Sequence, residues 1–99
     1  MDILNFIEAW ILSLRVFLES SGVTVRFERT TDERPKASCV VNLRRDAVEA
    51  DLIVWESGEA DLTTMDRQGK VDQQHFEDVS GAGDLATLLA RVLNAVDSR

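Results

Sequence analysis

The stretch Val54–Phe76, VWESGEADLTTMDRQGKVDQQHF, contains two turn signals between runs of alternating residues. Ser57-Gly58 is typical of a two-residue β-hairpin turn, because glycine adopts the positive φ that such a turn requires. Residues 66–70, DRQGK, predict a type I turn followed by a glycine bulge, with aspartate at its favoured first position. Two such turns in succession predict three consecutive antiparallel strands.

The two turns also predict which side chains share a face of the sheet. A two-residue first turn pairs Glu56 with Glu59 and Trp55 with Ala60. A three-residue second loop then places Phe76 opposite Ala60 and His75 opposite Asp61. This register puts Ile53, Trp55, Ala60 and Leu62 on an apolar core face. It puts acidic and apolar residues together on the opposite face: Glu56, Glu59, Asp61, Leu52, Val54 and Met65.

An amphipathic helix is predicted before the strands, because apolar residues recur at helical spacing from residue 3 to residue 18. Gly22 is placed to cap the end of this helix. Leu12 and Val16 lie nearly opposite the apolar stripe, either as scattered surface residues, which we favour, or as a second small contact patch. The stripe consists of Ile3, Phe6, Ile7, Trp10, Ile11, Leu14, Phe17 and Leu18.

Two further strands and a second helix complete the expected architecture. Alternation predicts strands over residues 23–28 and 37–43, joined by a polar loop at Thr30–Lys36, with a turn at Arg44–Glu49. Asp84 is a plausible N-cap for a final amphipathic helix. The whole chain, residues 1–99, is therefore expected to be a single α+β domain, a two-layer sandwich in which both helices cover one face of a five-stranded antiparallel meander.

Composition excludes several classes of protein. The net charge of −7 argues against binding to nucleic-acid phosphates. The apolar segment Ile3–Leu18 lacks the positive start of a signal peptide, since Asp2 and Glu8 flank and interrupt it, and it is too short and charged to span a bilayer. The one cysteine, Cys39, cannot form an intramolecular disulfide. A cytoplasmic protein without a membrane partner is expected.

No residue pattern indicates catalysis, a metal or a cofactor. His75 beside Asp61 is half of a metal site or of an acid–base pair at most, and an exposed histidine in a sheet is the favoured interpretation. Residues 81–84, GAGD, resemble a phosphate loop but contain no lysine and end with a carboxylate, which repels phosphate. Trp10 and Trp55 are expected to be core aromatics.

The acidic face of the meander is the candidate partner-binding surface. Residues 46–84 contain eleven acids and only two bases. In the predicted register Glu56, Glu59 and Glu77 form one cross-strand row, and their repulsion is either tolerated for solubility or relieved by a basic partner. Apolar residues beside the acids favour an interface. The candidate contact residues are Glu56, Glu59, Asp61, Leu52, Val54, Met65, Glu77 and His75.

The stretch LIVWESGEADL, Leu52–Leu62, resembles the TriTu family of bacterial immunity proteins, small cytosolic antitoxins of polymorphic-toxin and type VI secretion systems. The element order and the acidic second half are similar too. The resemblance implies a non-enzymatic protein that neutralises a cognate toxin domain, in some pairs one that attacks nucleic acid or transfers ADP-ribose. An acidic secretion chaperone that escorts an effector without inhibiting it is the alternative.

Overall fold

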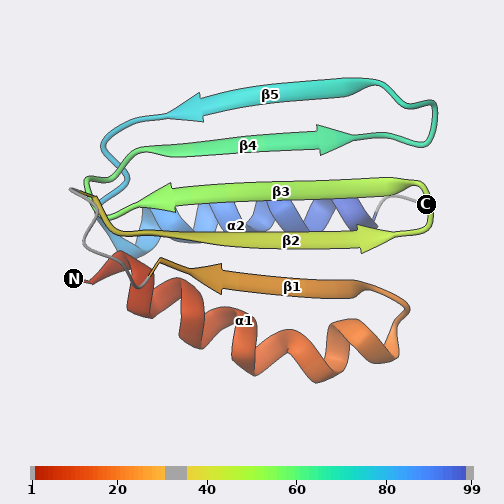
Figure 1. The fold of residues 1–99 in the computed structure, drawn as a ribbon, viewed down its shortest axis with the longest axis horizontal. Helices are drawn as coiled ribbons and strands as arrows, with labels where there is room; N and C mark the ends of the chain where they lie inside the picture. The colour runs from red at the N-terminus through yellow and green to blue at the C-terminus, as the bar shows by residue number, and fades with distance from the viewer. Residues whose placement is uncertain (1, 31–35, 98–99) are drawn as a thin grey trace.

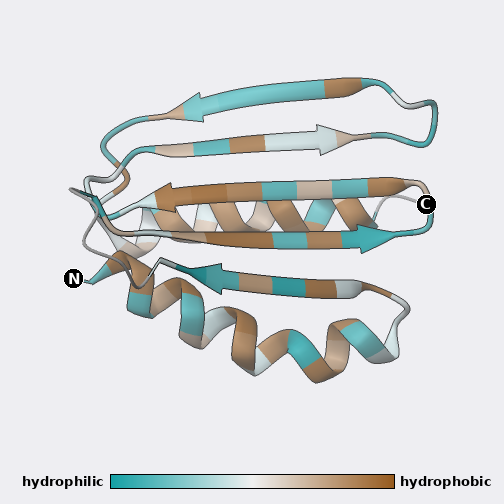
Figure 2. Cartoon of the chain, in the orientation of Figure 1, coloured by the Kyte–Doolittle hydropathy of each residue, from teal (hydrophilic) through white to brown (hydrophobic). Residues whose placement is uncertain are grey.

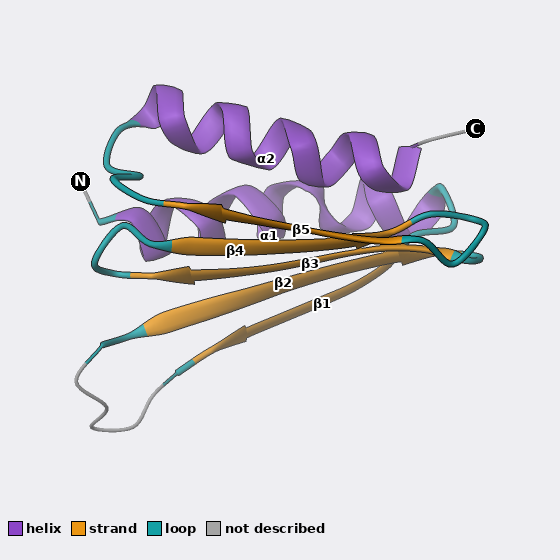
Figure 3. Ribbon diagram, turned by 90° about the horizontal axis from the view of Figure 1, so that it is seen from above, coloured by secondary structure: helices purple, strands orange, loops and turns teal. Residues whose placement is uncertain are grey.

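The computed structural model describes residues 2–30 and 36–97, which form a helix, a five-stranded antiparallel sheet and a second helix. The strands follow one another across the sheet in the order β1-β2-β3-β4-β5. Both helices lie on the same side of this sheet, so its other face is open (Figures 1 and 3). The expected α+β meander is confirmed. The elements are α1 Ile3–Ser20, β1 Thr24–Arg29, β2 Ser38–Arg45, β3 Val48–Trp55, β4 Ala60–Met65, β5 Val71–Phe76 and α2 Ala82–Asp97.

Local hydrogen bonds define both ends of α1. The Asp2 side chain accepts a hydrogen bond from the backbone N–H of Asn5 at 3.1 Å and so caps the first turn. At the other end Gly22 has φ +90°, and the Val23 N–H donates to the carbonyl of Leu18 at 3.0 Å. This left-handed glycine and its hydrogen-bond pattern form a Schellman motif, which confirms Gly22 as the helix stop.

The core lies between the helices and one face of the sheet. Apolar residues recur along both helices and dominate β2 and β3, whereas β5 is largely hydrophilic (Figure 2). Phe17, expected in the buried stripe of α1, is instead 68% exposed. None of the helices among residues 2–30 and 36–97 has the length and apolarity needed to cross a membrane. The helical residues of the core are Ile3, Leu4, Ile7, Ile11, Leu18, Leu85, Leu88, Leu89, Val92 and Val96.

The second helix begins earlier than expected. Its first residue is Ala82, and the Leu85 N–H donates to the carbonyl of Gly81 at 3.1 Å. Asp84, expected as the N-cap, therefore lies within the first turn, where a carboxylate still interacts favourably with the helix dipole. Its side chain accepts a hydrogen bond of 3.4 Å from the Ser80 N–H.

The connection between β2 and β3 is shorter than expected. Only Asp46 and Ala47 separate the strands, and Asp46 has φ +52°, in the left-handed region. Arg45 pairs with Val48, so most of the predicted turn at Arg44–Glu49 belongs to the strands. Of the expected loop at Thr30–Lys36, residues 31–35 lie outside the described residues.

The β3–β4 hairpin turns over three residues, not over two as the sequence predicts. The Gly58 N–H donates to the Trp55 carbonyl at 3.0 Å, and the Trp55 N–H donates to the Glu59 carbonyl at 2.9 Å. Gly58 has φ +94°, the left-handed conformation of a glycine bulge after a type I turn. The register is therefore shifted by one residue from the predicted one: Val54 pairs with Ala60, Ile53 with Asp61 and Leu52 with Leu62.

The β4–β5 hairpin confirms its prediction. The Gly69 N–H donates to the Asp66 carbonyl at 3.0 Å, the Asp66 N–H donates to the Lys70 carbonyl at 3.0 Å, and Gly69 has φ +81°. Phe76 pairs with Ala60 on the core side, as expected. Both hairpins thus use the same type I turn and glycine bulge.

Candidate functional site

The one-residue shift exchanges the two faces of β3. Leu52 and Val54, expected among the partner-binding residues, are fully buried beneath the helices, each with 0% of its surface exposed. Ile53 and Trp55, expected in the core, alternate with them and lie on the open face, half-buried and not packed against the core cluster. Two predicted contact residues are therefore wrong in placement, and two predicted core residues lie where a partner has access.

One cross-strand row runs over all five strands of the open face. Glu28 pairs with Val40, Val40 with Ile53, Ile53 with Asp61 and Asp61 with His75. The row therefore has an apolar centre on β2 and β3 and a carboxylate on each side of it. An apolar centre with a polar rim is the usual composition of a protein–protein interface.

Trp55 extends this apolar centre toward the β3–β4 turn. It pairs with Ser38 on β2, and Glu59, directly before β4, lies across the turn from it. A shallow hollow of about 340 Å³ opens here on the open face, lined by Glu28, Arg29, Thr30, Ser38, Val40, Ile53 and Trp55. A partly exposed tryptophan beside a hollow suits partner binding, because tryptophan is enriched among the residues that dominate binding energy.

The expected pairing of Glu56 with Glu59 across the turn is absent, because Trp55 takes the place of Glu56 opposite Glu59. The Glu56 N–H donates to the carbonyl of Ala37, the residue before β2, at 2.9 Å. Glu56 is therefore hydrogen-bonded toward β2 and does not pair with Glu59. Glu59 instead accepts hydrogen bonds from Lys36 at 2.8 Å and from the Ser57 hydroxyl at 3.2 Å. These bonds, from Lys36 first, lower the pKa of Glu59 below its usual value.

Asp61 on β4 and His75 on β5 form one end of the central row. The Nδ1 of His75 lies 2.5 Å from the Oδ1 of Asp61, and its Nε2 lies 3.6 Å from Glu77. The hydrogen bond to Asp61 raises the pKa of His75, and the nearby carboxylates of Asp61, Glu77 and Glu59 act in the same direction. The predicted neighbourhood of His75 and Asp61 is confirmed, and the histidine remains about half exposed.

Further acids lie at the opposite end of the open face. The Asn42 amide bridges Glu49 at 2.8 Å and Asp51 at 3.0 Å. Met65, an expected contact residue, pairs with Glu49 and with Val71 on this end of the face. The open sides of the strands carry four acids, Glu28, Glu49, Asp51 and Asp61, against two arginines, Arg26 and Arg44. Glu56, Glu59 and Glu77 add acid near the β3–β4 turn.

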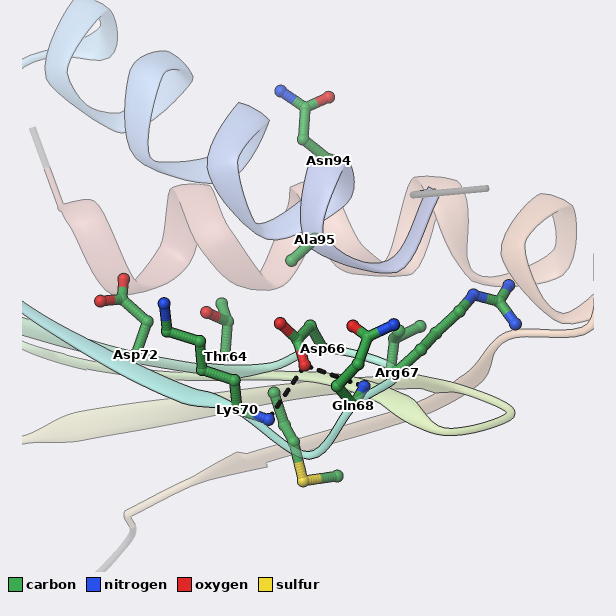
Figure 4. Close-up of a pocket in the computed structure, with 10 residues that line it drawn as sticks. Thr64, Asp66, Arg67, Gln68, Lys70, Asp72, Asn94 and Ala95 are labelled. Carbon is green, nitrogen blue, oxygen red and sulfur yellow. Dashed lines mark hydrogen bonds between the residues drawn. The ribbon is translucent and has the colours of Figure 1, made fainter.

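A larger hollow lies elsewhere, between the β4–β5 turn and the end of α2 (Figure 4). Its volume is about 640 Å³, and of its two lining residues on α2 Ala95 points toward the turn whereas Asn94 points away from it. The carboxylate of Asp66 accepts hydrogen bonds from the N–H groups of Gln68 at 3.0 Å and Lys70 at 2.9 Å. Asp66 thus stabilises the turn, and its Oδ1 already has two backbone donors.

No group of three or more potential metal-ligating side chains occurs among residues 2–30 and 36–97. Burial raises the pKa of the Cys39 thiol to about 11, so it stays protonated and unreactive at neutral pH. His75 and Asp61 form a hydrogen-bonded acid–base pair on the open face.

The family model described as "Immunity protein TriTu" matches residues 5–95, which is nearly the whole chain. No curated protein and no solved structure matches the chain. Ile53, Trp55, Val40 and Glu28 belong to the candidate surface but were not among the contact residues expected from sequence. Ile53 and Trp55 share strand parity with Glu49 and Asp51, whose charges exclude these acids from the core, and Val40 pairs with Ile53.

Proposed function

The chain belongs to the TriTu family of immunity proteins, and we propose that it binds and neutralises a cognate secreted toxin domain through the open face of its sheet. In this proposal it acts in the cytoplasm of the bacterium that makes the toxin, and it inhibits by contact, without chemistry of its own. The toxin is a basic domain, with a nuclease or an ADP-ribosyltransferase as the proposed classes.

The observation that carries the choice of surface is the row of Glu28, Val40, Ile53, Asp61 and His75, with Trp55 beside it. Its apolar centre supplies area that is buried on binding, and the carboxylates around it supply a negative field. Such a field speeds encounter with a basic partner and selects against acidic ones. Fast association suits an antitoxin, since the toxin must be captured before it acts.

Within this surface Trp55 is the proposed anchor. Its indole is partly exposed beside a hollow that a partner side chain can fill, and Glu59 and Glu28 flank it. Basic side chains of a toxin are attracted here both by the carboxylates and by the face of the indole, which binds cations. Of the residues expected from sequence, Glu59, Asp61, His75 and Met65 remain in the proposed surface, with Glu56 and Glu77 at its edge.

The experiment is coexpression with the toxin domain encoded beside this chain, followed by affinity purification and an assay of toxin activity. We expect the two proteins to copurify and the bound toxin to be inactive. A secretion chaperone, the alternative function, would copurify with a toxin that remains active. Absence of copurification from the adjacent gene product would contradict toxin binding itself.

The first prediction tests the surface separately from the function. Trp55→Ala should weaken toxin binding by at least about 30-fold, because anchor residues contribute about 2 kcal/mol or more. Leu12→Ala is the matched control, since Leu12 is an exposed apolar residue on α1, 57% exposed and away from the open face. Titration of toxin activity with each variant measures the effect. If Trp55→Ala inhibits the toxin normally and Leu12→Ala does not, the toxin binds on the helix side of the sheet and not on the open face.

A further inference from the structure

Exposed large apolar side chains gather on α1. Four such residues occur in the described part of the chain, and three of them lie on this helix: Leu12 at 57%, Val16 at 80% and Phe17 at 68% exposed. Leu12 and Val16 are one turn apart and therefore adjacent on the helix surface. The fourth, Val71, is 56% exposed on β5, at the edge of the sheet. Large apolar residues that are clustered, not scattered, mark a surface that another molecule covers.

The outer face of α1 is also free of charge. The three charged side chains of the helix, Glu8, Arg15 and Glu19, share the flank that contacts β1. There Glu8 lies 3.3 Å from Arg29, Arg15 lies 3.0 Å from Glu19, and Arg15 Nη2 donates to the Val25 carbonyl at 3.5 Å. The remaining exposed residues form an uncharged strip in a chain that is 29% charged: Asn5, Ala9, Leu12, Ser13, Val16, Phe17 and Ser20.

A hollow lies directly beside this strip. It has a volume of about 580 Å³ and lies between the C-terminal ends of α1 and α2, with Phe17 at its edge. Leu18, Leu93 and Val96 make much of its lining apolar. The same surface thus carries protruding apolar side chains, Val16 and Phe17, and a recess that can receive such side chains.

We propose that the uncharged strip of α1 and this hollow form a self-association surface that joins two copies of the chain about a two-fold axis. A two-fold contact requires one patch to be complementary to itself, with a protrusion and a recess side by side, and this patch has both. In such a dimer Val16 and Phe17 of each copy pack toward the hollow of the other.

Charge selects a second copy over other partners. Each molecule carries a net charge of −7, so two copies repel unless they meet where no acid lies. The strip of α1 carries no acid, and in the hollow the one acid, Asp97, is accompanied by one base, Arg45, so the surface has no net charge. The acidic open face lies on the other side of the sheet (Figure 3). A basic partner has no carboxylate to bind on the strip. Since the helix and the open face are on opposite sides, a dimer leaves both open faces available.

Sedimentation velocity of the purified chain, from about 1 μM to about 1 mM, tests the proposal, because this range covers weak and moderate dimers. The mass should rise with concentration from 11.1 kDa toward twice that value. Higher salt should favour the dimer, since it screens repulsion between two acidic molecules. A monomer throughout this range overturns the proposal, and so does a dimer that dissociates as salt is raised.

Variants locate the contact. Val16→Glu and Phe17→Ser should each raise the dissociation constant at least about ten-fold, because each removes apolar contact and Val16→Glu adds repulsion. Val71→Glu is the matched control, an exposed apolar residue outside the strip, and should leave the constant unchanged. All three residues are exposed, so thermal unfolding should confirm intact folds. Equal effects of Val16→Glu and Val71→Glu would overturn the assignment to α1.

Discussion

The two sides of β3 are both apolar and yet have different roles. Leu52 and Val54 point under the helices and are fully buried, whereas Ile53 and Trp55 point to the open face beside Asp61. Hydrophobicity therefore does not distinguish core from surface along this strand. The length of the β3–β4 loop does, because a shift of one residue moves every side chain of a strand to the other face.

The largest expected difference between the two sides of β3 is in stability. Leu52→Ala should lower the free energy of unfolding by about 2–5 kcal/mol, because it leaves a cavity in a closely packed core. Ile53→Ala should lower it by less than about 1.5 kcal/mol, since the open face has no helix over it. Urea unfolding of both variants measures this. A larger loss of stability for Ile53→Ala than for Leu52→Ala would support the two-residue turn that the sequence predicts.

A smaller effect is expected at the two glycines of the hairpin loops. Gly58→Ala should destabilise the protein by about 2–3 kcal/mol and Gly69→Ala by about 1 kcal/mol. Both glycines have positive φ, +94° and +81°, but only at Gly58 would a Cβ meet backbone, the Val79 carbonyl oxygen at 2.9 Å. Thermal unfolding of both variants gives the comparison, and equal losses would show that Val79 moves away without cost.

The smallest effect concerns the pH dependence of the open face. The hydrogen bond to Asp61 raises the pKa of His75 above its ordinary value, so the protonated histidine stabilises the fold. This contribution is fully present below the unfolded-state pKa and is lost as the pH rises through the folded-state pKa. His75→Gln should therefore be less stable than the parent at about pH 5.5 and equally stable at about pH 9.

The free energy of unfolding of the parent and of His75→Gln should be measured across this pH range. Both groups are about half exposed, so the difference should be small and should shrink at high salt. A constant difference between the two proteins at every pH would assign the effect to packing and not to protonation of the imidazole.

The two hairpins show where prediction from sequence succeeds. In residues 66–70 the aspartate, the glycine and the spacing all favour one loop, and Asp66 itself bonds two backbone N–H groups of that loop. Local chemistry was sufficient there, and the neighbourhood of His75 and Asp61 followed from it correctly. At Ser57-Gly58 both a two-residue and a three-residue loop fit the local sequence. The shorter one was wrong.

The error at the first hairpin has its origin at the start of β3. A turn at Arg44–Glu49 excludes Glu49 from the following strand. The alternation of Glu49 and Asp51 along that strand is then not visible, and it does not help to assign the faces of β3. In the structure β3 starts at Val48, and Glu49 and Asp51 alternate with buried Val48 and Ala50. Strand parity then requires Ile53 and Trp55 to share the face of these acids. The centre of the candidate site was missed for this reason.

The sequence alone determined the order of the elements, most of the core residues of α1, the helix stop at Gly22 and the second hairpin, because each depends on periodicity or on contacts within a few residues. Only the tertiary structure decided whether the β3–β4 loop has two residues or three. That choice depends on distant partners: Ala37, whose carbonyl accepts the Glu56 N–H, and Val79, whose N–H donates to the Gly58 carbonyl at 2.9 Å. These contacts join segments far apart in the chain, so no local pattern around Ser57-Gly58 contains them.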